Sequence, residues 1–300
     1  MSDKRILLTG VNGQVGFELA RSLQGLGTVV ALDRAGLDLS SPDKIREVVR
    51  SVSPSLIVNP AAYTAVDKAE TERDAAHAIN ATAPGILAEE AKRGGIPLIH
   101  YSTDYVYAGD KNGIYTEADP TDPQNVYGAS KLAGEEAIRA SGCAHVIFRT
   151  SWVYGVQGGN FVKTMLRLAA DRPALKVVGD QWGAPTSART IADITAHIVA
   201  QAASPQLSGG TSDKGLVWWE AKSGVYHLVA GGETNWAEYA KTIFALKGLG
   251  CEVTAIPASE YPVPAKRPSN SRLSTEKLQQ TFGIQPPQWE VALRHCLESI

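Results

Sequence analysis

The sequence predicts an α/β protein with a doubly wound parallel sheet and a smaller mixed α/β domain. In the first half of the 300-residue chain, short apolar segments of strand length alternate with segments whose apolar residues recur at helical spacing. The first strand leads into a glycine turn, Gly10 to Gly16, which opens the first helix. Buried strands that alternate with helices are typical of a parallel sheet of the Rossmann type, with helices on both faces.

Each element of the first half has its own local signal. The second strand is β-branched and ends at Asp33, and the next helix begins at Ser41 and Pro42, a typical cap and first-turn residue. Pro84 lies inside a long helical segment, where we expect a break or kink because proline cannot donate the helical hydrogen bond. The expected strands are 6–9, 28–32, 56–58, 97–100 and 145–148, and the expected helices are 13–26, 42–52, 71–92 and 127–140.

The second half is less regular. Residues 204–224 are rich in glycine and serine and predict a surface excursion, in which we interpret Trp218 and Trp219 as part of a locally packed hairpin. Residues 257–268 contain four prolines and predict an extended loop. The remaining patterns indicate helices at 160–170, 190–202, 236–246 and 290–297, and a strand at 226–230.

The charge balance and the cysteine and histidine spacing exclude several classes of function. Lys+Arg total 29 and Asp+Glu total 31, so the net charge of −2 gives no basic excess for nucleic acid or an anionic membrane surface. Three cysteines without a CxxC pair and six histidines without an i, i+4 pair predict neither a disulfide framework nor a zinc site. No apolar run approaches the ~20 residues of a membrane span, and no signal-peptide pattern opens the sequence. We therefore expect a cytoplasmic protein.

The glycine turn is a candidate phosphate-binding loop. Gly10, Gly13 and Gly16 open a helix whose free N–H groups and positive dipole end attract a pyrophosphate. The pattern G-x-x-G-x-x-G is a weak signal alone, but Asp33 follows at about the ~20-residue offset expected for an acid on the adenosine ribose. Asp33 favours NADH, whereas Arg34 could accept the 2'-phosphate of NADPH, so the choice of cofactor stays open.

Tyr127 and Lys131 form a Y-x-x-x-K pattern at the start of an expected helix. Spacing i, i+4 places both side chains on one face, ~5–6 Å apart at Cβ. There an ammonium favours the phenolate and makes the phenol a better acid. Thr103 follows the strand 97–100, at the carboxyl edge of the sheet where ligands bind. Together these side chains predict proton donation to a carbonyl oxygen whose carbon receives a hydride.

Seven stretches of the chain match one protein family in order. They are GVNGQVG (10–16), VNPAAYTAVDKAE (58–70), YSTDYVY (101–107), NVYGASKLAGE (125–135), FRTSWVY (148–154), DQWGAPT (180–186) and RPSNSRL (267–273). With these residues the chain resembles the extended short-chain dehydrogenase/reductases and, among them, the dTDP-4-dehydrorhamnose reductase family. The glycine turn and the Y-x-x-x-K stretch alone would indicate only the superfamily, whereas the other stretches make the resemblance specific.

The resemblance implies a role for individual residues. For cofactor binding it implies Gly13, Gln14, Val15, Asp33, Asp38, Leu39, Ala62, Tyr63 and Thr64. The motifs described above add Gly10, Gly16, Arg34, Tyr127 and Lys131 to the expected cofactor-binding residues. The implied catalytic set is Thr103, Tyr127 and Lys131, and the implied substrate-binding residues are Thr103, Asp104, Trp152, Arg267 and Arg272. The two arginines are candidates for the nucleotide diphosphate because a guanidinium fork suits phosphate geometry. Residues 1–155 with about 187–232 would bind the dinucleotide, and about 156–186 with 233–300 would bind the nucleotide sugar.

The function implied by the resemblance is NADPH- or NADH-dependent reduction of the C4 keto group of dTDP-4-dehydro-β-L-rhamnose to dTDP-β-L-rhamnose, a precursor of cell-surface polysaccharide. The partner is then a small nucleotide sugar, and the protein is a monomer or homodimer. One alternative is a nucleotide-sugar epimerase or dehydratase of the same superfamily. Dehydratases of this kind often carry Thr-Asp-Glu where this chain has Thr103, Asp104 and Tyr105. Another alternative is a non-catalytic regulatory subunit of the methionine adenosyltransferase type.

One departure from the family bears on a metal. The magnesium-bridged dimer described for the family uses three glutamates, of which Glu18 and Glu290 match two, while Arg189 occupies the third position. An arginine cannot ligate Mg²⁺ and brings positive charge to the place of the ion. We therefore expect no metal, and we expect Arg189 to pair with Glu18 or Glu290.

Overall fold

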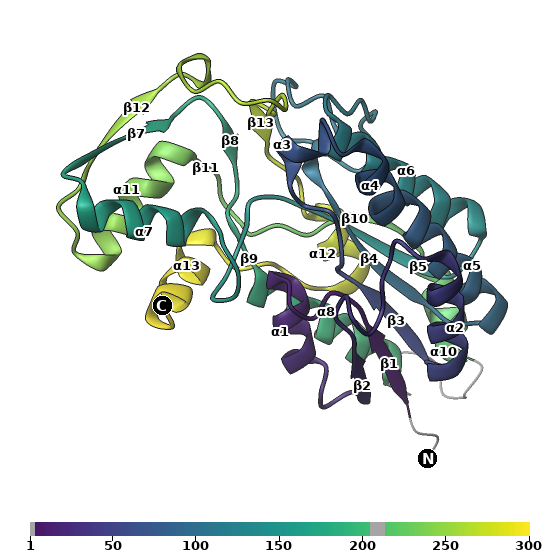
Figure 1. The fold of residues 1–300 in the computed structure, drawn as a ribbon. Coiled ribbons are helices and arrows are strands. Elements are labelled where there is room, and N and C mark those ends of the chain that lie inside the picture. The colour runs from purple at the N-terminus through teal and green to yellow at the C-terminus, as the bar shows by residue number, and fades with distance from the viewer. Residues whose placement is uncertain (1–3, 205–213) are drawn as a thin grey trace.

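The structure, a computed structural model, describes residues 4–204 and 214–300. Its centre is a sheet of six parallel strands in the order β2-β1-β3-β4-β5-β10 (Figure 1). The chain reverses its direction of winding between β1 and β3, which is the switch point where open α/β sheets bind ligands. The predicted doubly wound parallel sheet is confirmed. Its strands are β1 (Arg5–Leu8), β2 (Thr28–Ala31), β3 (Leu56–Asn59), β4 (Leu98–Thr103), β5 (His145–Thr150) and β10 (Gly224–His227).

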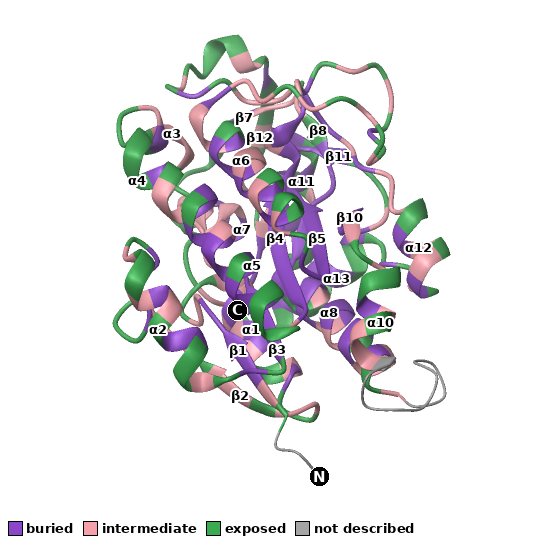
Figure 2. Cartoon of the chain, turned by 90° about the vertical axis from the view of Figure 1, so that its right-hand side faces the viewer, coloured by how far each residue is buried: buried purple, intermediate pink, exposed green. Residues whose placement is uncertain are grey.

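Helices cover both faces of this sheet, as Figure 2 shows for its buried central strands. Successive side chains of a strand point to opposite faces, so Ile6 and Leu8 of β1 belong to one apolar cluster and Leu7 to the other. The first cluster is closed by α1 (Gln14–Ser22), α8 (Ala188–Ala203), α10 (Lys214–Ala221) and α12 (Glu276–Phe282). The second is closed by α2 (Pro42–Val52), α5 (Ala83–Gly94) and α6 (Val126–Ser141). In the described part of the chain, every helix is too short or too polar to cross a bilayer.

The helical segment around Pro84 is interrupted by a π-helical turn and does not separate into two helices. After α3 (Val66–Ala69), it runs as α4 (Arg73–His77), the π-helical turn η1 (Ala78–Thr82) and α5, with Pro84 in the first turn of α5. The residues that join these pieces keep helical backbone angles, so the proline removes one hydrogen bond from a continuous helix and the π-helical turn directly precedes it. Ser41 is the residue before α2, as expected, but its side chain makes no capping hydrogen bond.

A third apolar cluster lies beside the sheet, among the elements labelled α7, α11 and α13 in Figure 1. It packs α7 (Phe161–Asp171), α11 (Trp236–Lys247) and α13 (Trp289–Glu298) against a parallel pair of strands, β7 (Ala174–Val178) and β12 (Glu252–Ile256). This is the smaller mixed α/β part that the sequence predicts. Short ladders join β6 (Val153–Tyr154) to β9 (Thr186–Ser187), and β8 (Trp182–Gly183) to β11 (Thr234–Asn235) and β13 (Asn270–Ser271). Two 3-10 turns complete the fold, η2 (Asp104–Val106) and η3 (Ala258–Glu260).

The hairpin expected around Trp218 and Trp219 is wrong. These residues lie in helix α10, and Trp219 is 5% exposed within the first apolar cluster of the sheet. The physical reason is that two adjacent indoles on a helix can turn toward one core and stack edge to face, here with ring centroids 5.1 Å apart. Residues 205–213 of the predicted excursion lie outside the described residues.

Candidate functional site

A cavity of about 610 Å³ opens at the carboxyl edge of the sheet. Its walls come from the segments that follow β1, β3, β4 and β5, together with the first turns of α1 and α6. Twelve of the residues predicted for the site line it: Gly10, Gly13, Gln14, Val15, Gly16, Ala62, Thr64, Thr103, Asp104, Tyr127, Lys131 and Trp152. Local patterns at the ends of separate strands therefore meet at one place.

The glycine turn forms one wall of the cavity. Gly10 has a φ of 58°, and a Cβ on Gly16 would lie 2.1 Å from the Gly10 carbonyl oxygen, so neither position accepts a side chain without displacing the backbone. Gly13 precedes α1 in extended conformation and no side chain caps the helix. The first N–H groups of α1 are thus available to an anionic group in the cavity.

Two buried hydroxyl groups at the cavity have no hydrogen-bond partner among the described residues. They are Ser102 Oγ at the end of β4 and Thr150 Oγ1 at the end of β5. Buried polar groups normally find a partner, so these two, with the uncapped helix and the glycine turn, fit a polar ligand such as a dinucleotide. Ser102 lies in the stretch 101–107 and Thr150 in the stretch 148–154, but neither residue was predicted for the site individually.

Thr103, Asp104 and Tyr127 form a connected polar group. Asp104 is 3% exposed and accepts hydrogen bonds from Thr103 Oγ1 at 3.0 Å and from Ser271 Oγ of β13. Burial raises the pKa of Asp104 to about 6, although both hydrogen bonds oppose the rise. Burial, and then the charge of Asp104, raise the pKa of the Tyr127 phenol above its usual value, while a hydrogen bond with Thr103 lowers it. Tyr127 therefore carries its proton at neutral pH in the ligand-free protein.

The ammonium of Lys131 forms part of the cavity floor. Its Nζ donates to the Tyr101 carbonyl oxygen at 2.6 Å and lies 3.2 Å from His100 Nε2. Burial lowers the pKa of Lys131 to about 8, partly offset by the carboxylate of Glu135 one turn further along α6. Lys131 and Tyr127 line the same cavity from successive turns of α6, and a buried ammonium with a lowered pKa in one cavity with a proton-bearing phenol is typical of acid–base sites.

Trp152 lines the cavity and has an unusual backbone conformation. Its φ of 50° is uncommon for a residue with a side chain and concentrates at functional sites. Its indole stacks on Trp236 of α11, with centroids 3.6 Å apart and rings inclined by 15°. Gly183 leaves room for the same indole, since a Cβ there would lie 2.8 Å from it. Trp152 was predicted for the site, whereas Trp236 and Gly183 were not.

Five predicted cofactor residues do not line the cavity. Asp33 follows β2, where its Oδ1 accepts from the N–H groups of residues 35 and 36 at 3.0 Å each, and its Oδ2 lies 3.5 Å from the amide of the cavity residue Asn12. Arg34 is exposed. Asp38 accepts hydrogen bonds from Ser40, which lower its pKa, and the charge of Arg34 lowers it further by a smaller amount. The other two are Leu39, which packs in the core, and Tyr63, whose hydroxyl donates to Glu72 at 2.6 Å.

Both predicted phosphate-binding arginines form ion pairs in the ligand-free protein. Arg267 Nη2 lies 2.7 Å from Asp67, and its guanidinium lies 5.9 Å from the ring centroid of the cavity residue Tyr105. Arg267 Nη1 is buried without a hydrogen-bond partner among the described residues. Arg272 Nη1 lies 3.4 Å from Glu233, and its Nε donates to Asn270 Oδ1 at 2.8 Å. Of the two, Arg267 is the one with an unused donor next to the site.

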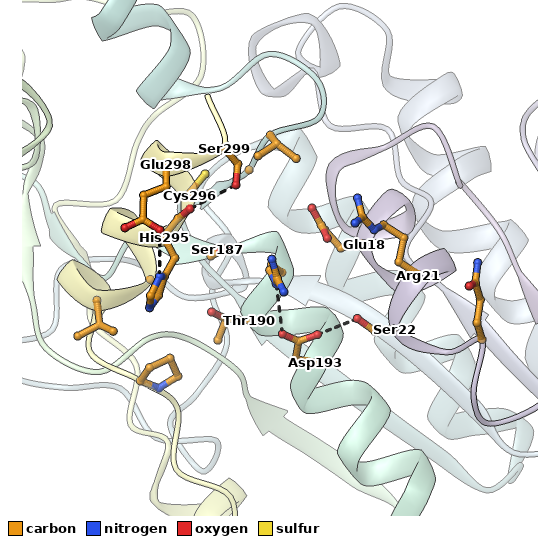
Figure 3. A pocket seen from close by; sticks show the side chains of 17 residues that line it. Glu18, Arg21, Ser22, Ser187, Thr190, Asp193, His295, Cys296, Glu298 and Ser299 are labelled. Atoms are coloured by element: carbon orange, nitrogen blue, oxygen red, sulfur yellow. Dashed lines mark hydrogen bonds and ion pairs between the residues drawn. The ribbon is translucent and has the colours of Figure 1, made fainter. Parts of the chain in front are cut away.

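A second cavity, of about 1200 Å³, lies between α1, α8 and α13 and is lined by Glu18, Arg21 and Asp193 among others (Figure 3). The expected pairing of Arg189 with Glu18 or Glu290 is wrong. Arg189 Nε lies 3.7 Å from Asp193, one turn along α8, and the same carboxylate accepts from Ser22 at 2.7 Å. Arg189 pairs with Asp193 because the two side chains lie one turn apart on the same helix, whereas Glu18 and Glu290 lie on other helices that face the cavity. Within residues 4–204 and 214–300, no cluster of three or more His, Cys, Asp or Glu side chains could hold a metal ion.

Comparisons with known proteins agree along the whole chain. A model of the family described as the RmlD substrate binding domain matches residues 4–300. The chain is 47% identical over 304 residues to a Burkholderia thailandensis protein named dTDP-4-dehydrorhamnose reductase, and the match covers 99% of each. The structure of a dTDP-4-dehydrorhamnose reductase from Clostridium acetobutylicum is similar with a TM-score of 0.89 at 35% identity, covering 98% of this chain and 99% of that one. The enzyme of that name from Bacillus anthracis, solved in complex with NADP, has a TM-score of 0.89 at 33% identity and coverages of 99% and 100%.

Proposed function

The chain belongs to the RmlD substrate binding domain family, and from that premise we propose that it reduces the C4 keto group of dTDP-4-dehydro-β-L-rhamnose to dTDP-β-L-rhamnose with NADPH or NADH. The observation that carries the proposal is the cavity in which a proton-bearing Tyr127, its neighbour Thr103 and the buried ammonium of Lys131 meet below the glycine turn. A reductase that only transfers a hydride and a proton needs these three side chains. It does not need a second carboxylate next to Asp104, where dehydratases of the superfamily often carry a glutamate.

The cavity residues divide the work of the reaction. NADPH or NADH, when bound, supplies the hydride for the sugar C4. Tyr127 donates its proton to the oxygen on that carbon as charge develops there, and Thr103 orients the same oxygen. Lys131 holds a positive charge at the floor, which favours the phenolate that remains after proton transfer. Asp104, linked to β13 through Ser271, and Trp152 position the hexose.

The clusters on the two faces of the sheet are separate from the third cluster, which supports a division of the chain into two domains with different ligands. We propose residues 1–155 and about 187–232 as the dinucleotide-binding domain, because the sheet and the glycine turn belong to it. Residues of about 156–186 and 233–300 would form the nucleotide-sugar domain and bring Arg267 next to the cavity. A phosphate group could take over the Arg267 guanidinium from Asp67 and satisfy the buried Nη1 as well. The remaining cofactor assignments, including Asp38, Leu39 and Tyr63, stay predictions.

The assay that tests this function generates the 4-keto sugar in place from dTDP-glucose with the two preceding enzymes and follows NADPH and NADH absorbance separately. We expect loss of one cofactor per sugar converted, with dTDP-rhamnose as product. Product without net cofactor loss would favour an epimerase or dehydratase instead. Cofactor binding with no conversion at all would favour the regulatory-subunit alternative.

A cytoplasmic monomer or homodimer without nucleic-acid or membrane partners follows from the same proposal, because a nucleotide sugar and a reduced nicotinamide are metabolites of that compartment. Arg189 at the second cavity predicts that the oligomer does not depend on magnesium. The mass in solution should be the same with Mg²⁺ and with a chelator, and a change in mass with Mg²⁺ would contradict this.

Gly16→Ala should weaken NADPH binding by about 5- to 150-fold. The added Cβ would lie 2.1 Å from the Gly10 carbonyl oxygen, so the turn must move away from its binding geometry, at a cost of about 1–3 kcal/mol. Fluorescence titration of NADPH measures the change. Gly25→Ala is the matched control, because no atom lies within 4 Å of a Cβ at that position. Equal affinities of the two variants would contradict a phosphate-binding role for the turn.

Asp33→Asn should shift the cofactor preference toward NADPH. The asparagine keeps an oxygen for the N–H groups of residues 35 and 36 but removes the charge that opposes a 2'-phosphate. We expect kcat/KM for NADPH relative to NADH to rise by about tenfold or less, since the group is partly exposed. Asp33→Ala should raise the KM for NADH more than the KM for NADPH. Equal losses with both cofactors would remove Asp33 from ribose recognition.

A further inference from the structure

A row of buried polar side chains leads from the edge of the sheet to Lys131. Thr9 follows β1, Asn59 ends β3 and His100 lies in β4, where Asn59 and His100 are register partners. Thr9 Oγ1 lies 2.6 Å from Asn59 Oδ1, the Asn59 amide lies 3.1 Å from His100 Nδ1, and His100 Nε2 lies 3.2 Å from Lys131 Nζ. Each of the four residues is 1% exposed or less. The row therefore links three neighbouring strands to α6 on one face of the sheet.

The chemistry of the row restricts the imidazole to one role. His100 is buried and lies beside an ammonium, and both effects hold its pKa well below the usual value, so the ring is neutral. A neutral imidazole has one N–H donor and one acceptor nitrogen. The ammonium of Lys131 can only donate, so Nε2 must accept and Nδ1 must carry the proton. This tautomer requires the Asn59 amide to exchange its oxygen and nitrogen relative to the contacts given above, in which the NH₂ faces His100 Nδ1 and Oδ1 faces Thr9. After the exchange the oxygen accepts from Nδ1–H, and the NH₂ donates to the Thr9 hydroxyl, which can accept as readily as it donates.

We propose that His100 is a positioning residue for Lys131. Its Nε2 accepts a hydrogen bond from the ammonium and, with the Tyr101 carbonyl oxygen, fixes the nitrogen at the floor of the cavity, while Asn59 and Thr9 hold the imidazole in the accepting tautomer. The role of Lys131 in a reduction rests on the proposed function. The effect of His100 on the affinity of this chain for the nicotinamide dinucleotide can be measured without that reaction.

The charges around Lys131 give the sign of the effect. Glu135 on α6 favours the ammonium, and Arg149 on β5 holds Glu135 in place through an ion pair. His100 on β4 contributes an acceptor and no charge, and Tyr127 on α6 is a neutral phenol. Removal of an acceptor from a buried ammonium favours the neutral amine, so the pKa of Lys131, already lowered to about 8, should fall further. Binding that needs the ammonium should then be lost at a lower pH.

The test is the pH dependence of NADPH binding in His100→Phe and His100→Gln, measured by fluorescence without sugar substrate. Phenylalanine fills the space without an acceptor, whereas the glutamine amide offers an oxygen to Lys131 and an NH₂ to Asn59. We expect the alkaline limb of NADPH affinity to move down by about one pH unit in His100→Phe and to return toward the wild-type position in His100→Gln. KM for NADPH should rise about fivefold at pH 8 in the first variant, because the protonated fraction of Lys131 falls by that factor when its pKa moves down by about one unit, with a smaller change in kcat.

Two outcomes would overturn the proposal. One is a folded His100→Phe protein with the wild-type pH profile, and the other is equal impairment of both variants, which would indicate a packing role alone. If His100→Phe does not fold, Thr9→Val removes only the hydroxyl at the far end of the row and should move the limb in the same direction by less. An unchanged profile in Thr9→Val would then count against the row. Because NADPH binding is measured without sugar, failure of the proposed reductase activity in the wild-type protein is a separate result.

Discussion

Tyr127→Phe should lower kcat by about 10²- to 10⁴-fold and leave NADPH affinity within a few-fold of the wild-type value. The phenol is the group in the cavity that both carries a proton at neutral pH and touches the Thr103 hydroxyl. Phenylalanine keeps the ring and its edge-to-face contact with Tyr105, whose centroid lies 5.6 Å away. The variant therefore removes the acid and preserves the packing.

The measurement is single-turnover reduction of the 4-keto sugar at saturating NADPH, beside an NADPH titration. Tyr239→Phe is the matched control. The Tyr239 hydroxyl is also buried, it has no hydrogen-bond partner among the described residues, and Tyr239 belongs to the third apolar cluster, among α7, α11 and α13. That variant should keep kcat within about twofold. Full activity of Tyr127→Phe would remove this residue as the acid and leave Thr103 or a water as the proton source.

The sheet could be predicted from the sequence because each of its first strands is a short apolar run bounded by a turn signal. Parallel strands share one carboxyl edge, so a motif directly after a strand is placed in space as soon as the strand is recognised. This is why Gly10 and Thr103, more than 90 residues apart, were predicted for one site. Trp152 was predicted from the resemblance to a known family, and all three residues line one cavity.

The remaining elements depend on contacts that no local pattern contains. β7 and β12 were not predicted, since β7 is only half buried and its partner lies more than 70 residues later. The stack of Trp152 on Trp236 and the ion pair of Arg189 with Asp193 are likewise decided by which side chains come within reach after folding. Trp218 and Trp219 were assigned to a hairpin from the composition of their neighbours, although an apolar pair beside a core also fits a helix.

His100 shows a related limit of sequence reasoning. In the sequence it is an ordinary polar residue at the end of an apolar strand, and its isolation from other histidines excludes only a metal site. Its relation to Lys131 appears when the register of β3 and β4 places it beside Asn59 and when α6 brings the lysine over the same face.

Glu135→Gln should destabilise the protein by about 3–5 kcal/mol, because it leaves the buried guanidinium of Arg149 without its counter-charge. Arg149 donates to Glu135 through Nε at 2.9 Å and Nη2 at 2.6 Å, and through Nη1 to the Tyr107 hydroxyl at 2.6 Å. Glu135 is fully buried and Arg149 is 3% exposed. Urea unfolding at pH 7 measures the loss. Glu238→Gln is the control, since its pair with Lys241 is exposed and should contribute under about 1 kcal/mol.

The same variant separates stability from function. The Glu135 carboxylate opposes the lowering of the Lys131 pKa by burial, so its neutral amide should lower that pKa further and move the alkaline limb of NADPH binding to lower pH. Arg149→Met breaks the same ion pair but leaves the Glu135 charge, and should destabilise the fold without moving the limb downward. If both variants shift the limb alike, the shift comes from disorder around α6, and the charge of Glu135 does not set the protonation of Lys131. If only Glu135→Gln shifts it, the buried pair serves both the fold and the charge at the cavity floor.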